Sequence, residues 1–150
     1  MIVSNEKSTQ NIAKKVANSI NGTSSVICLN GDLGSGKTTF TRHLIRYLQK
    51  NKFTNEIPSP TFTLLQIYDY QLGQIYHYDF YRLDKIEELF ELNFSESLRN
   101  NICIIEWANK FKKALPANRI EINFEIISDI SRNLEFNFLG KFKKDIFKWL

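Results

Sequence analysis

The chain has 150 residues, of which 43% are hydrophobic and 24% charged, a composition typical of a folded globular protein. Its net charge of +4 permits a nucleotide or nucleic-acid partner without identifying one. No apolar run is long enough for a membrane span and no secretory signal core follows Met1, so we expect one cytoplasmic domain over residues 1–150, with no membrane partner. The two cysteines, Cys28 and Cys103, lie in apolar runs without metal-binding spacing, which indicates reduced core residues.

The first predicted element is a helix over residues 5–20. Asn5 is suited to the N-cap, Glu6 lies in the first turn, and apolar residues then recur at helical spacing up to Ile20. Asn21-Gly22 supplies residues that commonly end a helix. We expect the next unit to start a few residues later.

That next unit, residues 25–49, contains the most informative stretch of the sequence. Residues 31–38 read Gly-Asp-Leu-Gly-Ser-Gly-Lys-Thr and satisfy the P-loop pattern G-x-x-x-x-G-K-[ST]. An apolar run, Val26–Leu29, predicts a buried strand before the loop, and an amphipathic helix is predicted from Lys37 onward, which is the context the pattern requires. The alternative is a glycine-rich turn that happens to precede Lys-Thr.

In a P-loop, backbone N–H groups and a helix N-terminus converge on phosphate oxygens. The lysine would reach the β- and γ-phosphates, and the threonine hydroxyl would complete the coordination shell of Mg²⁺. The pattern therefore predicts a nucleoside triphosphate site formed by these residues: Asp32, Leu33, Gly34, Ser35, Gly36, Lys37, Thr38 and Thr39.

The middle of the chain is predicted to form a hairpin and a short helix. Phe62–Tyr70 and Gln74–Tyr81 are aromatic-rich and strand-like, and a short turn joins them as an antiparallel pair. Residues 84–92 predict a short acidic helix that Asp84 caps and that ends at Asn93, a residue type that tolerates left-handed backbone.

The last part of the chain returns to strands. Ile102–Ile105 is a second buried apolar run, followed by a short helix to about Leu115 and two strands whose apolar residues alternate cleanly. The tail from Lys141 is amphipathic. As a helix packed on the core it would bury Phe142, Ile146 and Trp149, and as an RNA contact it would use its four lysines; the large apolar residues favour packing. The order of elements predicts a three-layer α/β P-loop domain around a mixed parallel and antiparallel sheet.

Two acidic residues are candidates for hydrolysis, which a P-loop alone does not supply. Glu106 ends the second apolar run, the layout of a Walker-B acid with Glu in place of Asp, and would reach Mg²⁺ at the C-terminal end of a parallel strand. A surface glutamate at a strand end is the alternative. Strand alternation sends His77, Asp79 and Tyr81 to one face. His77 taken alone is more often a hydrogen-bonded structural residue than a base.

Four motifs carry a family resemblance: G-D-L-G-S-G-K-T-T-F, S-P-T-F-T-L, H-Y-D-F-Y-R-L and I-I-E-W. In this order and spacing they resemble the TsaE family, the small bacterial ATPases of the tRNA threonylcarbamoyladenosine pathway. They span Gly31 to Trp107, about half of the chain. The resemblance implies a cytoplasmic protein that binds ATP and Mg²⁺ and joins the heterodimer of TsaB and TsaD. Its ATPase would support repeated transfer of threonylcarbamoyl to the adenosine next to the anticodon, so that it meets tRNA indirectly, through the complex.

Matched motif by motif, the resemblance also implies roles for single residues. These are Lys37 as the phosphate lysine, Thr38 as a metal ligand, Thr61 as a switch-like threonine, Asp79 as a catalytic or metal-proximal acid, Glu106 as the Walker-B acid and Trp107 as its aromatic neighbour. Glu6 and Arg132 are expected nucleoside contacts by position only. Three departures from the family pattern, Ser35, Asn93 and Ala108, remove no charged or ligating group.

Two other classes share the P-loop. A small-molecule kinase would need an arginine cluster or lid over the transferred phosphoryl group, whereas the arginines here are scattered along 150 residues. A GTP-dependent switch would need a guanine-specific N-K-x-D element, and Asn51-Lys52-Phe53-Thr54 lacks its Asp. Preference for ATP over GTP, with release of ADP and no phosphorylated acceptor, would distinguish the three.

Overall fold

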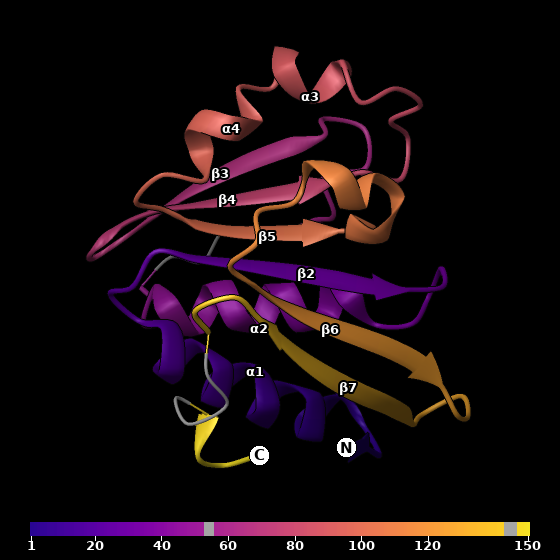
Figure 1. The fold of residues 1–150 in the computed structure, drawn as a ribbon. Helices are drawn as coiled ribbons and strands as arrows, with labels where there is room; N and C mark the ends of the chain where they lie inside the picture. The colour runs from indigo at the N-terminus through magenta and orange to yellow at the C-terminus, as the bar shows by residue number, and fades with distance from the viewer. Residues whose placement is uncertain (53–55, 143–146) are drawn as a thin grey trace.

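The computed structural model describes residues 1–52, 56–142 and 147–150. Along the chain the elements are β1 (Ile2–Val3), α1 (Glu6–Ile20), β2 (Ser25–Gly31), α2 (Lys37–Leu48), β3 (Leu65–Tyr70), β4 (Gly73–Asp79), α3 (Glu88–Glu91), α4 (Phe94–Ser97), β5 (Ile102–Glu106), a 3₁₀ helix (Ala108–Ala114), β6 (Arg119–Ile126) and β7 (Arg132–Leu139). The strands form one seven-stranded sheet in the order β1-β7-β6-β2-β5-β4-β3 (Figure 1).

The sheet is mixed, as the sequence predicts. Strand β2 pairs in parallel with β5 and β6, and β4 pairs in parallel with β5. Strands β3 and β7 each pair antiparallel with the strand that precedes or follows them along the chain. The C-terminal ends of β2, β4 and β5 therefore meet at one edge of the sheet, which is where open α/β sheets bind ligands.

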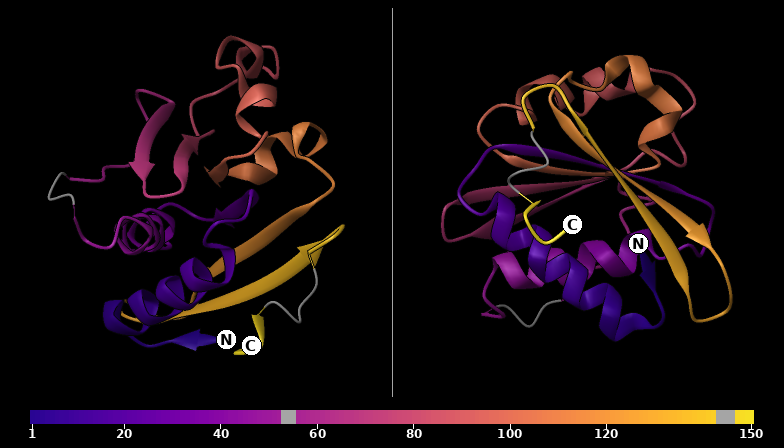
Figure 2. Two further views of the ribbon diagram at one scale, coloured as in Figure 1. Left: turned by 90° about the vertical axis from the view of Figure 1, so that its left-hand side faces the viewer. Right: turned by 60° about the horizontal axis from the view of Figure 1, so that its bottom comes forward.

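Helices and loops cover both faces of this sheet (Figure 2). Helices α1 and α2 lie against one face, where Ala13, Val16, Phe40 and Leu44 are fully buried with the strand residues Ile27 and Ile104. The segment with α3 and α4 covers the other face around Tyr78, Cys103 and Phe94. Alternate residues of one strand thus belong to opposite layers of the core.

Helix α1 begins where the sequence predicts. The Asn5 side chain accepts a hydrogen bond from Ser8 N at 2.8 Å, and Ser8 Oγ accepts one from Asn5 N at 3.1 Å. This reciprocal pair satisfies two N–H groups that the first turn of a helix leaves free. The expected N-cap is confirmed.

The hairpin of β3 and β4 is confirmed, but its first strand is shorter than expected. Residues 61–64 form a turn in which Leu64 N donates to Pro60 O and Leu64 has a φ of +65°. A left-handed leucine interrupts the extended backbone, so β3 starts at Leu65 instead of Phe62. Strand β4 ends at Asp79, which places Tyr81 two residues beyond it.

The expected acidic helix over residues 84–92 is largely wrong. The helical part is only Glu88–Glu91, and Asp84 does not cap it. Instead, Glu88 Oε1 accepts hydrogen bonds from Asp84 N at 2.9 Å and Lys85 N at 2.8 Å, which holds these residues in a turn. The left-handed backbone expected at Asn93 is present, with a φ of +50°.

The C-terminal tail packs on the core in its described part. Phe147 is buried, and Trp149 contacts Phe136 edge-on while its Nε1 donates to Ser19 Oγ at 3.1 Å. The packing that the sequence favours is confirmed for these residues. Lys143, Lys144 and Ile146 lie outside the described residues.

Both cysteines are buried and free, as expected. Burial in the core raises the pKa of the Cys28 and Cys103 thiols to about 12, because the thiolate would lose its hydration. Within the described ranges, every helix is too short or too polar to cross a lipid bilayer.

Candidate nucleotide-binding site

The glycine loop runs from the end of β2 to the start of α2. Gly34 has a φ of +75° and Gly36 a φ of +103°, values that L-residues with a side chain rarely adopt. A Cβ built at either glycine would find no heavy atom within 4 Å. The loop backbone therefore borders open space in front of a helix N-terminus, which is the arrangement that phosphate binding requires.

The Lys37 side chain folds back over this loop. Its Nζ donates to Gly31 O at 2.7 Å and Asp32 O at 2.8 Å, and it lies 4.2 Å from the centroid of the Trp107 ring. Burial lowers the pKa of Lys37, while Glu106, Asp79 and the neighbouring Asp32 act in the opposite direction. The ammonium group is held between loop carbonyls and an indole face, a cation–π contact.

Glu106 joins two other elements at the end of β5. Its Oε2 accepts a hydrogen bond from Thr38 Oγ1 at 2.8 Å, and its Oε1 lies 2.8 Å from His77 Nε2. Both Glu106 and His77 are buried. Glu106 is therefore not the surface residue that the sequence leaves as an alternative.

Asp79 ends β4 directly beside Glu106 in the parallel pairing. Its Oδ2 accepts hydrogen bonds from Ser59 Oγ at 2.7 Å and Thr61 Oγ1 at 2.9 Å, and its Oδ1 accepts one from Tyr81 N at 2.8 Å. Ser59 was not among the site residues expected from the sequence, although it opens the motif that contains Thr61. Two hydroxyl groups and one backbone N–H thus fix the orientation of a buried carboxylate.

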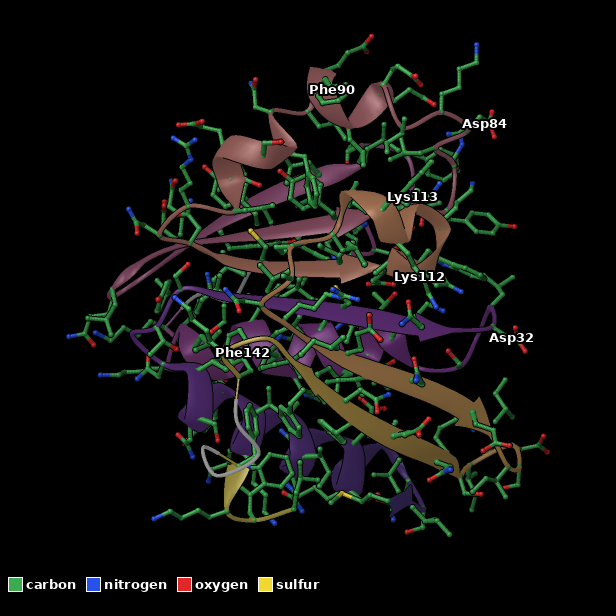
Figure 3. The ribbon with its side chains drawn as sticks, in the orientation of Figure 1. Asp32, Asp84, Phe90, Lys112, Lys113 and Phe142 are labelled. Atoms are coloured by element: carbon green, nitrogen blue, oxygen red, sulfur yellow. The ribbon has the colours of Figure 1, made fainter. Side chains whose placement is uncertain are left out.

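These groups surround one pocket of about 270 Å³. Its lining residues are Leu33, Gly34, Gly36, Lys37, Thr38, Thr39, Ser59, Thr61, Asp79, Tyr81, Glu106 and Trp107. Most residues singled out in the sequence are therefore brought together here. Asp32 is exposed at the outer rim of the loop (Figure 3), and Ser35 is buried beneath it.

A second pocket of about 300 Å³ lies on the other side of the glycine loop. Glu6 and Arg132 both line it, together with Gly34 and Gly36. Arg132 also contacts the loop itself, since its Nε donates to Ser35 O at 3.1 Å and its Nη2 to Gly34 O at 3.2 Å. The two pockets meet at the loop, with Asp79 and Glu106 on one side and Glu6 and Arg132 on the other.

The residues present fit a magnesium–nucleotide complex. The hydroxyl proton of Thr38 is directed to Glu106, which leaves the Thr38 oxygen lone pairs free for a cation. The open glycine backbone and the Lys37 ammonium group suit phosphate oxygens. The roles of the individual residues stay predictions.

Trp107 is expected to report nucleotide binding by fluorescence. Its ring lies over Lys37 and 5.0 Å from the ring of Tyr81, at the wall of the first pocket. A nucleotide that draws Lys37 away from the indole face would change its emission. The chain has two tryptophans, and Trp149 packs against Phe136 away from this pocket. Titration of Mg-ATP into a Trp149→Phe variant therefore measures the emission of Trp107 alone. Trp107 emission that stays unchanged at saturating Mg-ATP would contradict this prediction.

Comparisons with known proteins agree on one family. Residues 3–134 match a family model described as threonylcarbamoyl adenosine biosynthesis protein TsaE. A TsaE protein from Rickettsia felis is 43% identical over 132 residues, covering 88% of this chain and 75% of the relative. One from Bacillus subtilis is 34% identical over 137 residues, covering 91% and 83%. The crystal structure of Bacillus subtilis YdiB superposes with a TM-score of 0.72 at 28% identity, covering 97% of this chain and 88% of that one.

Proposed function

Because the chain belongs to the TsaE family, we propose that it is the ATP-binding and ATP-hydrolysing component of the complex that forms threonylcarbamoyladenosine in tRNA. The relatives are named for the biosynthesis of this modified nucleoside. The partners proposed for this chain are the TsaB and TsaD proteins, with tRNA reached through them. ATP hydrolysis would reset the complex for repeated turnover.

The observation that carries the proposal is the hydrogen bond between Thr38 and Glu106. The two residues are 68 positions apart, yet Thr38 Oγ1 lies 2.8 Å from Glu106 Oε2 at the mouth of the glycine loop. A P-loop ATPase needs this combination, because the loop hydroxyl and a carboxylate at a strand end together hold the metal. A glycine turn that preceded Lys-Thr by chance would have no reason to face a buried acid.

Binding of ATP follows from the loop and Lys37. The N–H groups at the start of α2 and the positive end of its dipole face the first pocket, where they favour anionic phosphate. Lys37 would exchange its bonds to the Gly31 and Asp32 carbonyls for stronger, charge-assisted bonds to phosphate oxygens. Arg132 holds the Gly34 and Ser35 carbonyls from the far side, so the loop keeps its shape when Lys37 leaves it.

Hydrolysis would depend on the two acids. Thr38 and Glu106 would hold Mg²⁺, which on binding supplies positive charge to the phosphates where negative charge develops. Asp79 would orient the attacking water, since Ser59, Thr61 and Tyr81 already fix its carboxylate at the pocket wall. The hydroxyl groups of Ser59 and Thr61 bind Asp79 in the structure, so a shift of their segment would alter that acid directly.

The test is the rate of ATP hydrolysis by the purified chain, measured alone and with the TsaB–TsaD heterodimer and tRNA. We expect release of ADP and phosphate, faster in the presence of the partners, and weaker use of GTP. Binding of ATP without hydrolysis in any mixture would contradict the proposal. Transfer of the phosphoryl group to a small acceptor would instead support a P-loop kinase.

Thr38→Ala is expected to remove most of the gain in ATP affinity that Mg²⁺ provides. The variant loses the hydroxyl group that faces Glu106 but leaves Lys37 and the loop amides in place. Isothermal titration of ATP with Mg²⁺ and with EDTA measures the gain. Thr38→Ser keeps the hydroxyl group and is the matched control; equal Mg²⁺ dependence in Thr38→Ala and wild type would exclude Thr38 as a metal ligand.

A further inference from the structure

We propose that His77 is a positioning residue that holds the Glu106 carboxylate in the orientation needed for Mg²⁺ binding. This inference rests on the ATPase function proposed above and extends it to a residue that touches neither metal nor nucleotide. Glu106 Oε1 is held by His77 Nε2 at 2.8 Å, while Glu106 Oε2 receives the Thr38 hydroxyl at 2.8 Å. The hydrogen bond from His77 would thus fix the direction of the Glu106 lone pairs that remain free for Mg²⁺.

The parallel pairing of β4 and β5 puts His77 in reach of Glu106. His77 pairs with Ile104, and Asp79, two residues further along, pairs with Glu106. Side chains two residues apart on a strand share a face, so His77, Asp79 and Glu106 all face α2 and the glycine loop. Because His77 lies two residues before Asp79 in β4, its imidazole approaches Glu106 from inside the core.

A buried carboxylate needs hydrogen-bond donors. Glu106 is 2% exposed and His77 is fully buried, so water cannot replace either partner. An ionised carboxylate only accepts hydrogen bonds, and His77 must therefore donate from Nε2. Each Glu106 oxygen then has one donor, from the core on one side and from the loop on the other. The carboxylate has one well-defined orientation.

The other ring nitrogen of His77 argues against a purely structural role. Among the described residues, His77 Nδ1 is a buried polar atom without a hydrogen-bond partner. Leaving such an atom unpaired costs stability, and an apolar side chain at this position would avoid the cost. Within the part of the chain that the structure describes, the contact with Glu106 is thus the only polar interaction of His77, and Glu106 is the acid proposed to bind the metal.

Residues behind a metal ligand typically change metal affinity by roughly 10- to 100-fold when they are removed. His77→Met keeps the volume and loses the donor, so we expect the Mg²⁺ affinity of the ATP complex to fall within this range. Affinity for ATP in EDTA should stay within about threefold of wild type, because Lys37 and the loop amides are unchanged. His77→Gln places an N–H group near the Nε2 position and should restore most of the Mg²⁺ affinity.

The experiment is a titration of Mg²⁺ into each variant at saturating ATP, together with ATP binding in EDTA and the melting temperature. Tyr78→Phe is the matched control: Tyr78 is equally buried in β4 and faces the opposite layer, and the variant loses the hydrogen bond from the Tyr78 hydroxyl to Ser97. Loss of Mg²⁺ affinity in His77→Met, rescue in His77→Gln and no change in Tyr78→Phe would support the proposal. Wild-type Mg²⁺ affinity in His77→Met, or loss in His77→Gln equal to that in His77→Met, would overturn it.

Failure of the ATPase proposal gives a different result. If the wild-type chain gains no ATP affinity from Mg²⁺, the proposed function fails; if it does gain and His77→Met gains equally, only the role of His77 fails. Should His77→Met not fold, ¹H–¹⁵N spectra of the wild-type imidazole rings decide. The chain has two histidines, so His43→Gln assigns the signals. A proton on His77 Nε2 that shifts on addition of Mg-ADP supports the proposal, and an Nε2 without a proton overturns it.

Discussion

Lys37→Ala is expected to weaken ATP binding by roughly 10- to 100-fold. A hydrogen bond between charged groups contributes about 1.5–3 kcal/mol, and the phosphate contact of Lys37 would form in a largely buried site. The lysine already lies in the loop, bonded to two of its carbonyls, so little ordering is required when ATP binds. Isothermal titration with Mg-ATP measures the loss.

Two further variants separate the charge from other effects of the substitution. Lys37→Met keeps the aliphatic stem against Trp107 but has no ammonium group, and it should lose as much affinity as Lys37→Ala. Lys110→Ala is the control for general loss of positive charge, because Lys110 is exposed and its Nζ donates to the backbone oxygen of Tyr81 at 2.6 Å. Wild-type affinity in either Lys37 variant would exclude the P-loop assignment; a loss in Lys110→Ala of the same size would indicate a diffuse charge effect.

The glycine loop and its flanks could be predicted from the sequence because their signals are local. A buried strand, glycines with left-handed backbone and an amphipathic helix follow one another within residues 25–48. Glu106 could also be predicted from a local signal, because a short apolar run that ends on an acidic residue is recognisable without information from the rest of the chain. Parallel pairing then brings Glu106 to the loop.

The errors arise where distant or side-chain contacts determine the backbone. Leu64 has a left-handed backbone conformation and ends the turn before β3. A leucine in a sequence gives no indication of this conformation. Glu88 bonds to the backbone of Asp84 and Lys85, so its side chain stabilises a turn in place of the expected first helical turn. Neither effect is encoded in hydrophobic periodicity.

The site contains a similar division. Asp79 could be selected from the sequence, but the hydroxyl groups that orient it belong to Ser59 and Thr61, which precede the hairpin of β3 and β4. The sequence places His77 on the same strand face as Asp79, yet only the pairing of β4 with β5 shows that His77 contacts Glu106. Arg132 was expected at the nucleoside, and the structure adds its bonds to the loop carbonyls. Partners across a sheet cannot be read from one strand.

Asp79→Ala is expected to lower the ATPase rate of the assembled complex by roughly 100-fold or more, within the range for positioned general bases. Equilibrium affinity for ATP should change much less, because a group that orients the attacking water acts mainly in the transition state. Steady-state rates with the TsaB–TsaD heterodimer and isothermal titration of the isolated chain measure the two quantities separately.

The matched variant is Asp79→Asn, which keeps the shape and one carbonyl oxygen but removes the charge. It can still accept hydrogen bonds from Ser59, Thr61 or Tyr81, so its fold should be close to wild type. If Asp79→Asn hydrolyses ATP at the wild-type rate, the residue orients its segment and has no role as a base. If affinity falls in step with the rate, Asp79 holds the ground-state complex. A low rate with intact affinity in both variants would assign proton transfer or orientation of water to Asp79. Such a result would mean that the proposed phosphate contacts of Lys37 remain, and that Glu106 alone does not sustain the reaction.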